Sequence, residues 1–378
     1  MDYGLGIEQK LLKDGAREFF AKESVKIPVR ETINDYKGYD ANIWKKMAEL
    51  GWMGILVPDQ YGGSGMAFID MVVLLYEMGY AFIPGPFFPS SVVGVIALLE
   101  AGHDTQKLQL LPEVIAGSRI LTLAWCEKRG TYSSDEISVR AELQSDHYIL
   151  SGTNRFVPYA HIADTILCAA KIDESAEGNK ERVSLFIVDK ASPGLSVQVL
   201  STIANDKQCE VTFDRVIVPR QNIMGEGNNG WPILKKVLQM AAVAKCAEMC
   251  GGAQKVLEMV VDHAKKRVQF GSPIGSFQAI QHHCANILTY VDTSALMTYQ
   301  ASWLISKGLP FEKEGSMCKV WVSDSYRKLV ALGHQVMGGT GYMEEVDLQL
   351  YFKHAKAAEL AYGDSDLHRE LVAEHIGL

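Results

Sequence analysis

The chain has 378 residues, 48% hydrophobic and 22% charged, so it can bury cores in two or three domains and is not disordered. Its 45 acidic and 37 basic residues give a formal charge of −8, which argues against a general nucleic-acid-binding protein, because such proteins carry a basic face. No uncharged apolar run reaches the ~20 residues of a membrane span. Seven cysteines without disulfide-like spacing, and no visible signal or transit peptide, predict a protein of the reducing cytoplasm.

Helical periodicity dominates the first third of the chain, and residues 1–119 are predicted to form an α-helical domain. Apolar residues recur every three or four positions in LLKDGAREFFAKE and in ANIWKKMAELGWMGILVP. Two breaks interrupt this pattern, a glycine-rich segment over 58–66 and a proline cluster over 83–91. At the prolines one helix must end before another begins.

The pattern changes near Ile120, where short β-branched or alternating runs begin. TILCAAK, VSLFIVD and CEVTFDRVIV are examples, and turn segments such as KASPG separate them. This spacing suits a small antiparallel barrel or sandwich. Residues 120–225 are therefore predicted to be a β domain inserted between helical ones.

Helical periodicity returns and continues to the end, so residues 226–378 are predicted to form a third, helical domain. Helices are expected over about 231–269, 278–306 and 314–332, with a short one after GGTGYMEEVD. The sequence contains no P-loop, HExxH, GxSxG, CxxC or Rossmann signature. Cys246 and Cys250 are predicted to be buried thiols on one helical face rather than metal ligands.

Two segments of the third domain contain residues suited to an anionic ligand. KKRVQFGSPIGSFQAIQH places Arg267 at a helix end before a glycine–proline turn, where a guanidinium can bind a pyrophosphate. HQVMGGTGY combines the amide of Gln335 with Gly338 and Gly339, which allow a backbone to approach a ligand closely. Taken singly, each segment is more simply explained as a helix end or a helix–helix turn than as a binding site.

Together with LVPDQYGGSGM, SGTNRFVPYAHIAD and the closing GDSDLHRELVAEHIGL, these segments resemble the acyl-CoA dehydrogenase family of flavoproteins over essentially the whole chain. The resemblance implies a mainly α fold with an N-terminal helical domain, a central β-barrel and a C-terminal four-helix bundle, assembled as a tetramer. It also implies FAD between barrel and bundle, with the adenine half held by a neighbouring subunit. The residues that it assigns to FAD binding are Trp125, Arg267, Phe270, Phe277, Gln278, Gln335, Gly338, Gly339, Asp364 and Asp366.

The usual catalytic base is missing from both of its family positions. Removing the α-proton of an acyl-CoA needs a desolvated carboxylate, and the family usually supplies a glutamate near the C-terminus, where this chain has Tyr362. Members that place the glutamate on the first long bundle helix have it where this chain has Ala241. Tyr362 is expected to line the acyl site. Asp364 and Asp366 are the nearest carboxylates, although acids in a first turn also stabilise a helix dipole. Pro158 stands where a hydroxyl would often face the flavin.

Three functions are compatible with this combination. The first is an FAD-dependent acyl-CoA dehydrogenase with a displaced base, which oxidises an acyl-CoA thioester, such as a cyclic or dicarboxylic one, to an enoyl-CoA and passes electrons to an electron-transferring flavoprotein. The second is a non-catalytic or half-site subunit that pairs with a competent homologue in a heterotetramer rather than a homotetramer. The third is an acyl-CoA-binding flavoprotein that catalyses an elimination or a reduction. The acyl group itself does not follow from the sequence.

Overall fold

The computed structural model describes residues 4–24, 29–125, 133–172, 182–225 and 229–378. Its contacts divide the chain into two compact units. The first, here called the helical unit, consists of Met1–Val29, Ala67–Ile83 and Gln239–Leu378. The second, the sheet unit, consists of Arg30–Met66 and Pro84–Leu238. Each unit therefore combines segments that are far apart in the sequence.

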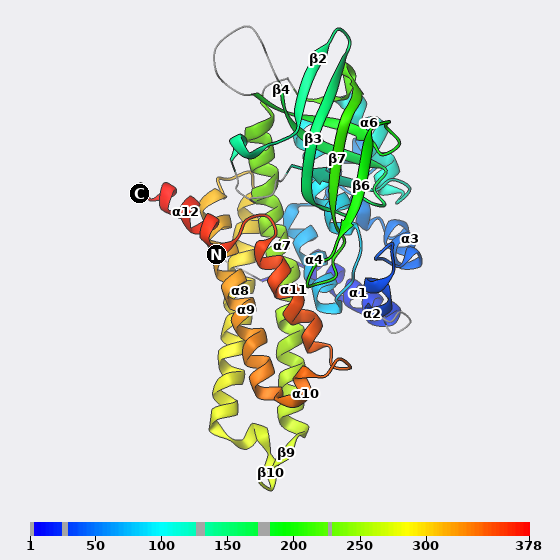
Figure 1. Cartoon of the computed structure of the whole chain (residues 1–378). Helices are drawn as coiled ribbons and strands as arrows, with labels where there is room; N and C mark the ends of the chain where they lie inside the picture. The colour runs from blue at the N-terminus through cyan, green and yellow to red at the C-terminus, as the bar shows by residue number, and fades with distance from the viewer. Residues whose placement is uncertain (1–3, 25–28, 126–132, 173–181, 226–228) are drawn as a thin grey trace. The chain divides into compact units, whose positions relative to one another are not determined.

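Long helices make up the helical unit. In chain order its elements are α1 (Ile7–Ser24), α4 (Phe68–Ala81), α7 (Gly230–Lys266) from Gln239 onward, the hairpin of β9 (Val268–Gln269) and β10 (Ser272–Pro273), α8 (Gln278–Ser306), α9 (Glu312–Met337), α10 (Gly339–Tyr342), α11 (Leu348–Leu360) and α12 (Ser365–His375). Figure 1 shows α7, α8, α9 and α11 side by side along their length, the arrangement of a four-helix bundle. The long helices predicted for the third domain are confirmed.

Small side chains allow α7 to lie inside this bundle. Apart from Lys245, Glu248 and Met249, the run AAVAKCAEMCGGA consists of small side chains, and most of residues 241–253 are buried. A Cβ built on Gly251 would lie 1.8 Å from the carbonyl oxygen of Tyr76, and one on Gly79 would lie 2.0 Å from that of Glu248. Helices α4 and α7 are therefore in direct backbone contact.

The sheet unit contains one eight-stranded sheet in which the strand order is β6-β7-β3-β2-β4-β5-β8, with β1 paired in parallel to β4. Among the described residues no pairing joins the edge strands β6 and β8, so the middle of the chain forms a sheet and not the closed barrel that the resemblance implies. The strands are β1 (Leu121–Ala124), β2 (Arg140–Gln144), β3 (His147–Pro158), β4 (Thr165–Ile172), β5 (Arg182–Asp189), β6 (Leu195–Leu200), β7 (Gln208–Pro219) and β8 (Ile223–Met224).

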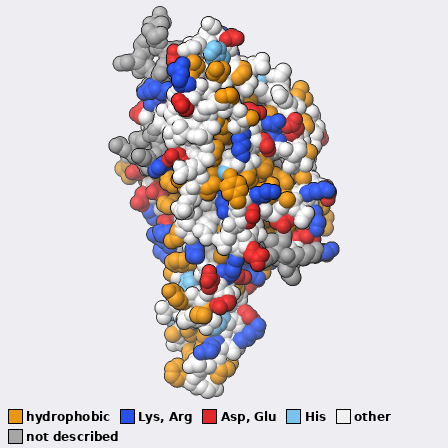
Figure 2. All heavy atoms as spheres, turned by 45° about the vertical axis from the view of Figure 1, so that its right-hand side comes forward, with side chains coloured by type: hydrophobic (Ala, Val, Ile, Leu, Met, Phe, Trp, Pro, Cys, Tyr) orange, Lys and Arg blue, Asp and Glu red, His pale blue; other side chains and the backbone are white. Residues whose placement is uncertain are grey.

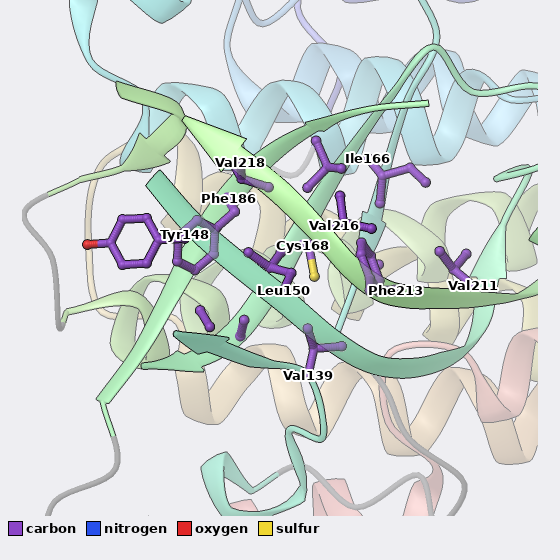
Figure 3. Packing of buried hydrophobic residues seen from close by; sticks show 14 of the residues in the cluster. Val139, Tyr148, Leu150, Ile166, Cys168, Phe186, Val211, Phe213, Val216 and Val218 are labelled. Carbon is purple, nitrogen blue, oxygen red and sulfur yellow. The ribbon is translucent and has the colours of Figure 1, made fainter. Parts of the chain in front are cut away.

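One apolar core lies against this sheet, and Figure 3 shows side chains from β3, β4, β5 and β7 gathered in it. Alternate residues of β7 enter the core, namely Cys209, Val211 and Phe213, as expected for a strand with one buried face. By contrast, every residue of β4 is buried, which explains why TILCAAK reads as a nearly continuous apolar run.

Short helices complete the sheet unit: α2 (Val29–Asn34), α3 (Ala41–Glu49), α5 (Val95–Ala101) and α6 (Asp104–Ile115). The predicted break in the proline cluster is confirmed, since α4 ends at Ala81, but the next helical segment, π-helical over Phe88–Gly94 and continuous with α5, already includes the last of these prolines, Pro89. No helix in the described ranges is both long and apolar enough to cross a membrane. Acidic and basic side chains are interspersed over the face drawn in Figure 2.

Candidate functional site

A tight turn joins α11 to α12 and carries Tyr362. Tyr362 has φ 58° and Gly363 has φ 100°, both in the left-handed region. An L side chain is strained there, so the surroundings must hold Tyr362 in place. A Cβ on Gly363 would lie 2.7 Å from Nε2 of His368, which makes glycine necessary at that position.

The buried side chain of Lys319, on α9, binds this turn and the end of α11. Its Nζ donates to the carbonyl oxygens of Ala358 (3.1 Å), Glu359 (2.8 Å) and Gly363 (2.9 Å) and to Oγ of Ser323 (3.2 Å). The last carbonyl groups of a helix lack helical partners and form the negative end of its dipole, so the ammonium caps α11. Burial lowers the pKa of Lys319 to about 8.

His368, on α12, binds the same turn. Its Nε2 lies 3.0 Å from the carbonyl oxygen of Tyr362, and because a carbonyl only accepts, Nε2 carries the proton. Burial lowers the pKa of His368 to about 4, so the ring is neutral at pH 7. Lys319 and His368 thus bind two successive carbonyl groups of the turn and fix where the phenol of Tyr362 lies.

The two carboxylates nearest to Tyr362 in sequence make local contacts. Asp364 is the N-cap of α12, and its side chain accepts from the backbone N–H of Leu367 at 2.9 Å. Asp366 pairs with Arg369 at 2.7 Å, and its side chain is 87% exposed. Both acids therefore act in the first turn of a helix, which is the simpler of the two interpretations of the sequence.

An ion cluster on α7 is absent from the sequence-based prediction. Ala241 is fully buried and apolar, but Glu248, two helical turns further on, lies 2.7 Å from Nζ of Lys245 and 2.7 Å from Nε2 of His354 on α11. Burial alone would raise the pKa of Glu248, but Lys245 and His354 lower it to about 2. The Lys-x-x-Glu spacing within an otherwise apolar stretch of α7, residues 240–253, could have indicated this ion pair.

Tyr362 cannot act as a base at neutral pH. Burial, reinforced by the negative charge of Glu248, raises the pKa of Tyr362 well above its ordinary value of 10. The phenol therefore stays protonated, so it can donate a hydrogen bond but cannot accept the α-proton of a thioester.

A second group of predicted site residues lies around the β9–β10 hairpin. Arg267 follows the last residue of α7, its side chain is exposed, and within the described residues its guanidinium has no partner. Phe270, at the hairpin tip, is 92% exposed, and its ring lies 6.1 Å from that of Phe277, the N-cap of α8. Gln278 is the exposed first residue of α8.

Gln335, Gly338 and Gly339 lie at the end of α9, at the same end of the helical unit as the hairpin (Figure 1). All three are exposed, and a Cβ on either glycine would have no atom within 4 Å. The Tyr362 turn lies at the far end of α11, whose 13 residues span about 20 Å. Within one chain, therefore, the hairpin residues and the Gln335–Gly339 segment lie at the same end of the helical unit. Tyr362, Asp364 and Asp366 lie at the other end of α11, away from them.

The exposed group has the chemistry that the diphosphate of FAD requires. A guanidinium and two side-chain amides are hydrogen-bond donors, and the open glycines allow close approach of a backbone to an anion. The residues present thus fit the cofactor. Trp125, also predicted to bind FAD, belongs to the sheet unit, where it is half-buried directly after β1. Pro158 ends β3, and its carbonyl oxygen accepts from Oγ1 of Thr122 on β1 at 2.6 Å. No three potential metal ligands cluster in the part of the chain that the structure describes.

Comparison with known proteins identifies the family. Models of the acyl-CoA dehydrogenase N-terminal, middle and C-terminal domains match residues 7–118, 122–216 and 228–377. The chain is 30% identical to acryloyl-CoA reductase (NADH) of Anaerotignum propionicum, over 100% of this chain and 96% of that protein.

Two solved structures share the fold along nearly the whole length. A chain in the structure of the electron transferring flavoprotein of Acidaminococcus fermentans superposes with a TM-score of 0.90 at 25% identity, covering 100% of both chains. A chain of the Tcur3481-Tcur3483 steroid ACAD G363A variant superposes with a TM-score of 0.86 at 27% identity, covering 99% of this chain and 98% of that one. The chain therefore belongs to the acyl-CoA dehydrogenase family, whose members are FAD-dependent oxidoreductases acting on CH–CH bonds.

Proposed function

We propose that the chain binds FAD and an acyl-CoA thioester, oxidises the thioester to an enoyl-CoA and passes the electrons to an electron-transferring flavoprotein. The observation that carries this proposal is the pair of groups in the helical unit, an exposed donor set suited to a diphosphate and, at the far end of α11, a turn at the family's position for the base. Bound FAD would supply the hydride acceptor. Because the two groups lie apart within a single chain, each site would be completed by residues of a neighbouring subunit.

The residues of the diphosphate group would bind and orient the cofactor. Arg267 would place its guanidinium on the diphosphate, Gln278 and Gln335 would donate amide hydrogen bonds, and Gly338 and Gly339 would let the backbone come close. Phe270 and Phe277 would pack beside them. Trp125 is proposed to contact FAD from the sheet unit.

The proton acceptor is not supplied by the Tyr362 turn. Tyr362 stays protonated, Asp364 caps α12 and Asp366 pairs with Arg369 in solvent. We propose that Tyr362 shapes the acyl site and donates a hydrogen bond there. Glu248 has the stabilised, ionised form of a paired carboxylate, which makes it a weak base.

The missing base favours a second candidate, a half-site subunit that works in a heterotetramer with a base-carrying homologue. The Tcur3481-Tcur3483 steroid ACAD is named for two proteins, which agrees with such an assembly. A homotetramer would require a base from elsewhere in the chain. We also propose a cytoplasmic location, because the six cysteines of the described ranges are all free thiols.

Purification of the chain alone tests these alternatives. A yellow homotetramer that oxidises butyryl-CoA, cyclohexanecarboxyl-CoA or glutaryl-CoA with an artificial electron acceptor would establish the active dehydrogenase. Colourless or inert protein that gains FAD and activity on co-expression with a homologue would establish the half-site subunit. A yellow protein that converts the corresponding enoyl-CoA esters and none of the saturated ones would exclude both in favour of a reductase.

A further inference from the structure

Lys319 is a buried titratable group for which the proposed function has no role. Its side chain is fully buried, and Nζ donates to three backbone carbonyl oxygens, of Ala358, Glu359 and Gly363, and to Oγ of Ser323. An ammonium group has three hydrogens, and here four acceptors lie within 3.2 Å of its nitrogen. Every hydrogen of the protonated side chain is therefore engaged, mostly with the end of α11 and the Tyr362 turn.

The turn that Lys319 binds has a backbone conformation that depends on its surroundings. Tyr362 has φ 58° and Gly363 has φ 100°, so two successive residues are left-handed. For a tyrosine this conformation is strained, and it persists only where neighbouring groups fix it. Lys319 and His368 bind the carbonyl oxygens of Gly363 and Tyr362, at 2.9 Å and 3.0 Å respectively. The place of the Tyr362 phenol therefore depends on these two donors.

A rise in pH weakens one of the two donors and leaves the other unchanged. Burial lowers the pKa of Lys319 to about 8, so the ammonium form is lost in mildly alkaline solution. The neutral amine costs less to bury, but it has two hydrogens instead of three and no charge, so its bonds to the carbonyl groups are fewer and weaker. His368 does not change in this range, because its pKa is lowered to about 4 and its ring stays neutral.

Burial is the main reason that Lys319 loses its proton so readily, and charged or titratable groups on neighbouring elements modify its effect. Cys246 on α7, Glu359 on α11 and Asp364 at the start of α12 favour the ammonium form, whereas Lys245 on α7 disfavours it. The ammonium form therefore dominates below about pH 8 and the neutral amine above it.

Two buried thiols near Lys319 require a control. Burial raises the pKa of Cys246 well above its ordinary value, so this thiol does not lose its proton before Lys319 does. A hydrogen bond with Cys246 lowers the pKa of Cys318, the residue before Lys319 on α9. Because this brings Cys318 towards the range in which Lys319 titrates, a variant without the Cys318 thiol is needed to separate the two groups.

We propose that the ammonium group of Lys319 positions the Tyr362 turn for the acyl group, so that loss of its proton loosens the turn and weakens acyl-CoA binding. Lys319 is a positioning residue, because it acts on the substrate through Tyr362. The inference rests on the proposed function, in which Tyr362 shapes the acyl site. It adds a form of regulation, since the site binds its substrate in neutral solution and releases it in alkaline solution.

Hydrogen–deuterium exchange tests the turn itself, on the purified full-length protein without substrate. Corrected for the intrinsic exchange rate, the amide protection of residues 358–368 should fall between pH 7 and pH 9.5, whereas that of a peptide within α8 should not. Lys319→Met should show the lower protection at both pH values. Lys328→Met, which removes an exposed lysine of the same helix, should behave as wild type.

Calorimetry on the FAD-loaded protein, with its partner subunit where FAD retention needs one, measures the Kd of the acyl ligand. The probes are the enoyl-CoA esters corresponding to butyryl-, cyclohexanecarboxyl- and glutaryl-CoA, which oxidised FAD cannot turn over, and the tightest binder at pH 7 is used. Between pH 7 and pH 9.5 a group with a pKa of about 8 loses all but about one-thirtieth of its protonated form, so Kd should rise roughly thirtyfold. Lys319→Met should bind weakly at both pH values, whereas Lys328→Met and Cys318→Ala should keep the wild-type rise.

The wild type alone can refute the inference, so the test does not depend on the folding of Lys319→Met. If Kd stays within about twofold between the two pH values, or rises without loss of protection in residues 358–368, Lys319 is a structural cap only. The same conclusion follows if Cys318→Ala abolishes the rise in Kd. In each of these cases the proposed function stands. If none of the esters binds at either pH, the proposed function is wrong and the inference fails with it.

Discussion

Replacing Lys319 by methionine removes the cation that binds the end of α11 and the Tyr362 turn. The substitution keeps the length and much of the volume of the side chain, so packing within α9 changes little. What is lost is the donor to three backbone carbonyl groups and one hydroxyl. In return, the variant avoids the desolvation cost of the Lys319 ammonium group, which is fully buried.

The two effects differ enough in size to predict the sign. Each hydrogen bond from a charged donor contributes roughly 1.5–3 kcal/mol, so the loss of three carbonyl contacts costs about 6 kcal/mol. Burial lowers the pKa of Lys319 from 10.5 to about 8, which corresponds to a penalty of about 3 kcal/mol that methionine avoids. We therefore expect Lys319→Met to lower the free energy of unfolding at pH 7 by about 3 kcal/mol.

The pH dependence separates this explanation from a simple packing defect. Between pH 8 and 10.5 the unfolded chain binds more protons at Lys319 than the folded chain does, so stability rises with pH in that window through this group. The methionine variant lacks this contribution. The stability difference between wild type and Lys319→Met should therefore widen by about 2 kcal/mol between pH 7 and pH 9.5.

Denaturant unfolding at the two pH values, followed by circular dichroism, measures both quantities. Lys328→Met is the matched control, since Lys328 lies on the same helix with an exposed side chain, and it should change stability by less than about 0.5 kcal/mol. A Lys319→Met variant as stable as wild type at pH 7, or a difference that narrows at pH 9.5, would refute the reasoning. It would mean that the carbonyl groups find other donors.

Three further predictions concern charged side chains of the helical unit. The folded-state pKa of Glu248 is lowered to about 2, so its ionised form contributes stability above pH 4.5 that is lost as the pH falls towards 2. Glu248→Gln should remove this contribution, and acid unfolding curves of wild type and variant that superpose would contradict the prediction. Arg267→Ala should lose FAD on gel filtration, because the diphosphate loses a charged hydrogen bond that contributes roughly 1.5–3 kcal/mol of binding free energy. Full flavin occupancy in that variant would show that Arg267 does not bind the diphosphate. Asp364→Ala should lower the free energy of unfolding by about 1 kcal/mol through loss of the α12 N-cap, whereas Asp364→Asn, which keeps a capping side chain, should not; equal losses would show a different role.

The helices of the third domain could be predicted because their periodicity is local. The segment 278–306 matches α8, and the family prediction that rested on motifs such as VQFGSPIGSFQAIQH is confirmed. The closed barrel could not be verified from sequence, because strand pairing is non-local: β1 pairs with β4, more than forty residues later in the chain, and the sheet stays open among the described residues. The domain boundaries at 119/120 and 225/226 stay predictions.

The candidate site was only partly predictable. The family resemblance places Tyr362 at the usual position of the base, but the reason for its fixed position lies in Lys319 and His368, which come from other helices and carry no motif. Glu248 and His354 are 106 residues apart, so no local pattern could place them in contact. The roles in FAD binding assigned to the hairpin and glycine residues stay predictions, because a single chain does not bring them to the Tyr362 turn.

The backbone contact between α4 and α7 has a consequence for biosynthesis. Helix α4 is apolar over most of its surface and is complete at Ala81, but the glycine face that covers it arrives with Gly251, about 170 residues later. At 5–20 residues per second, roughly 10 to 30 s of translation separate the two. During that interval other parts of the nascent chain, or a chaperone, must cover the apolar surface of α4. Slow synthesis between these segments should therefore favour aggregation of the unfinished chain.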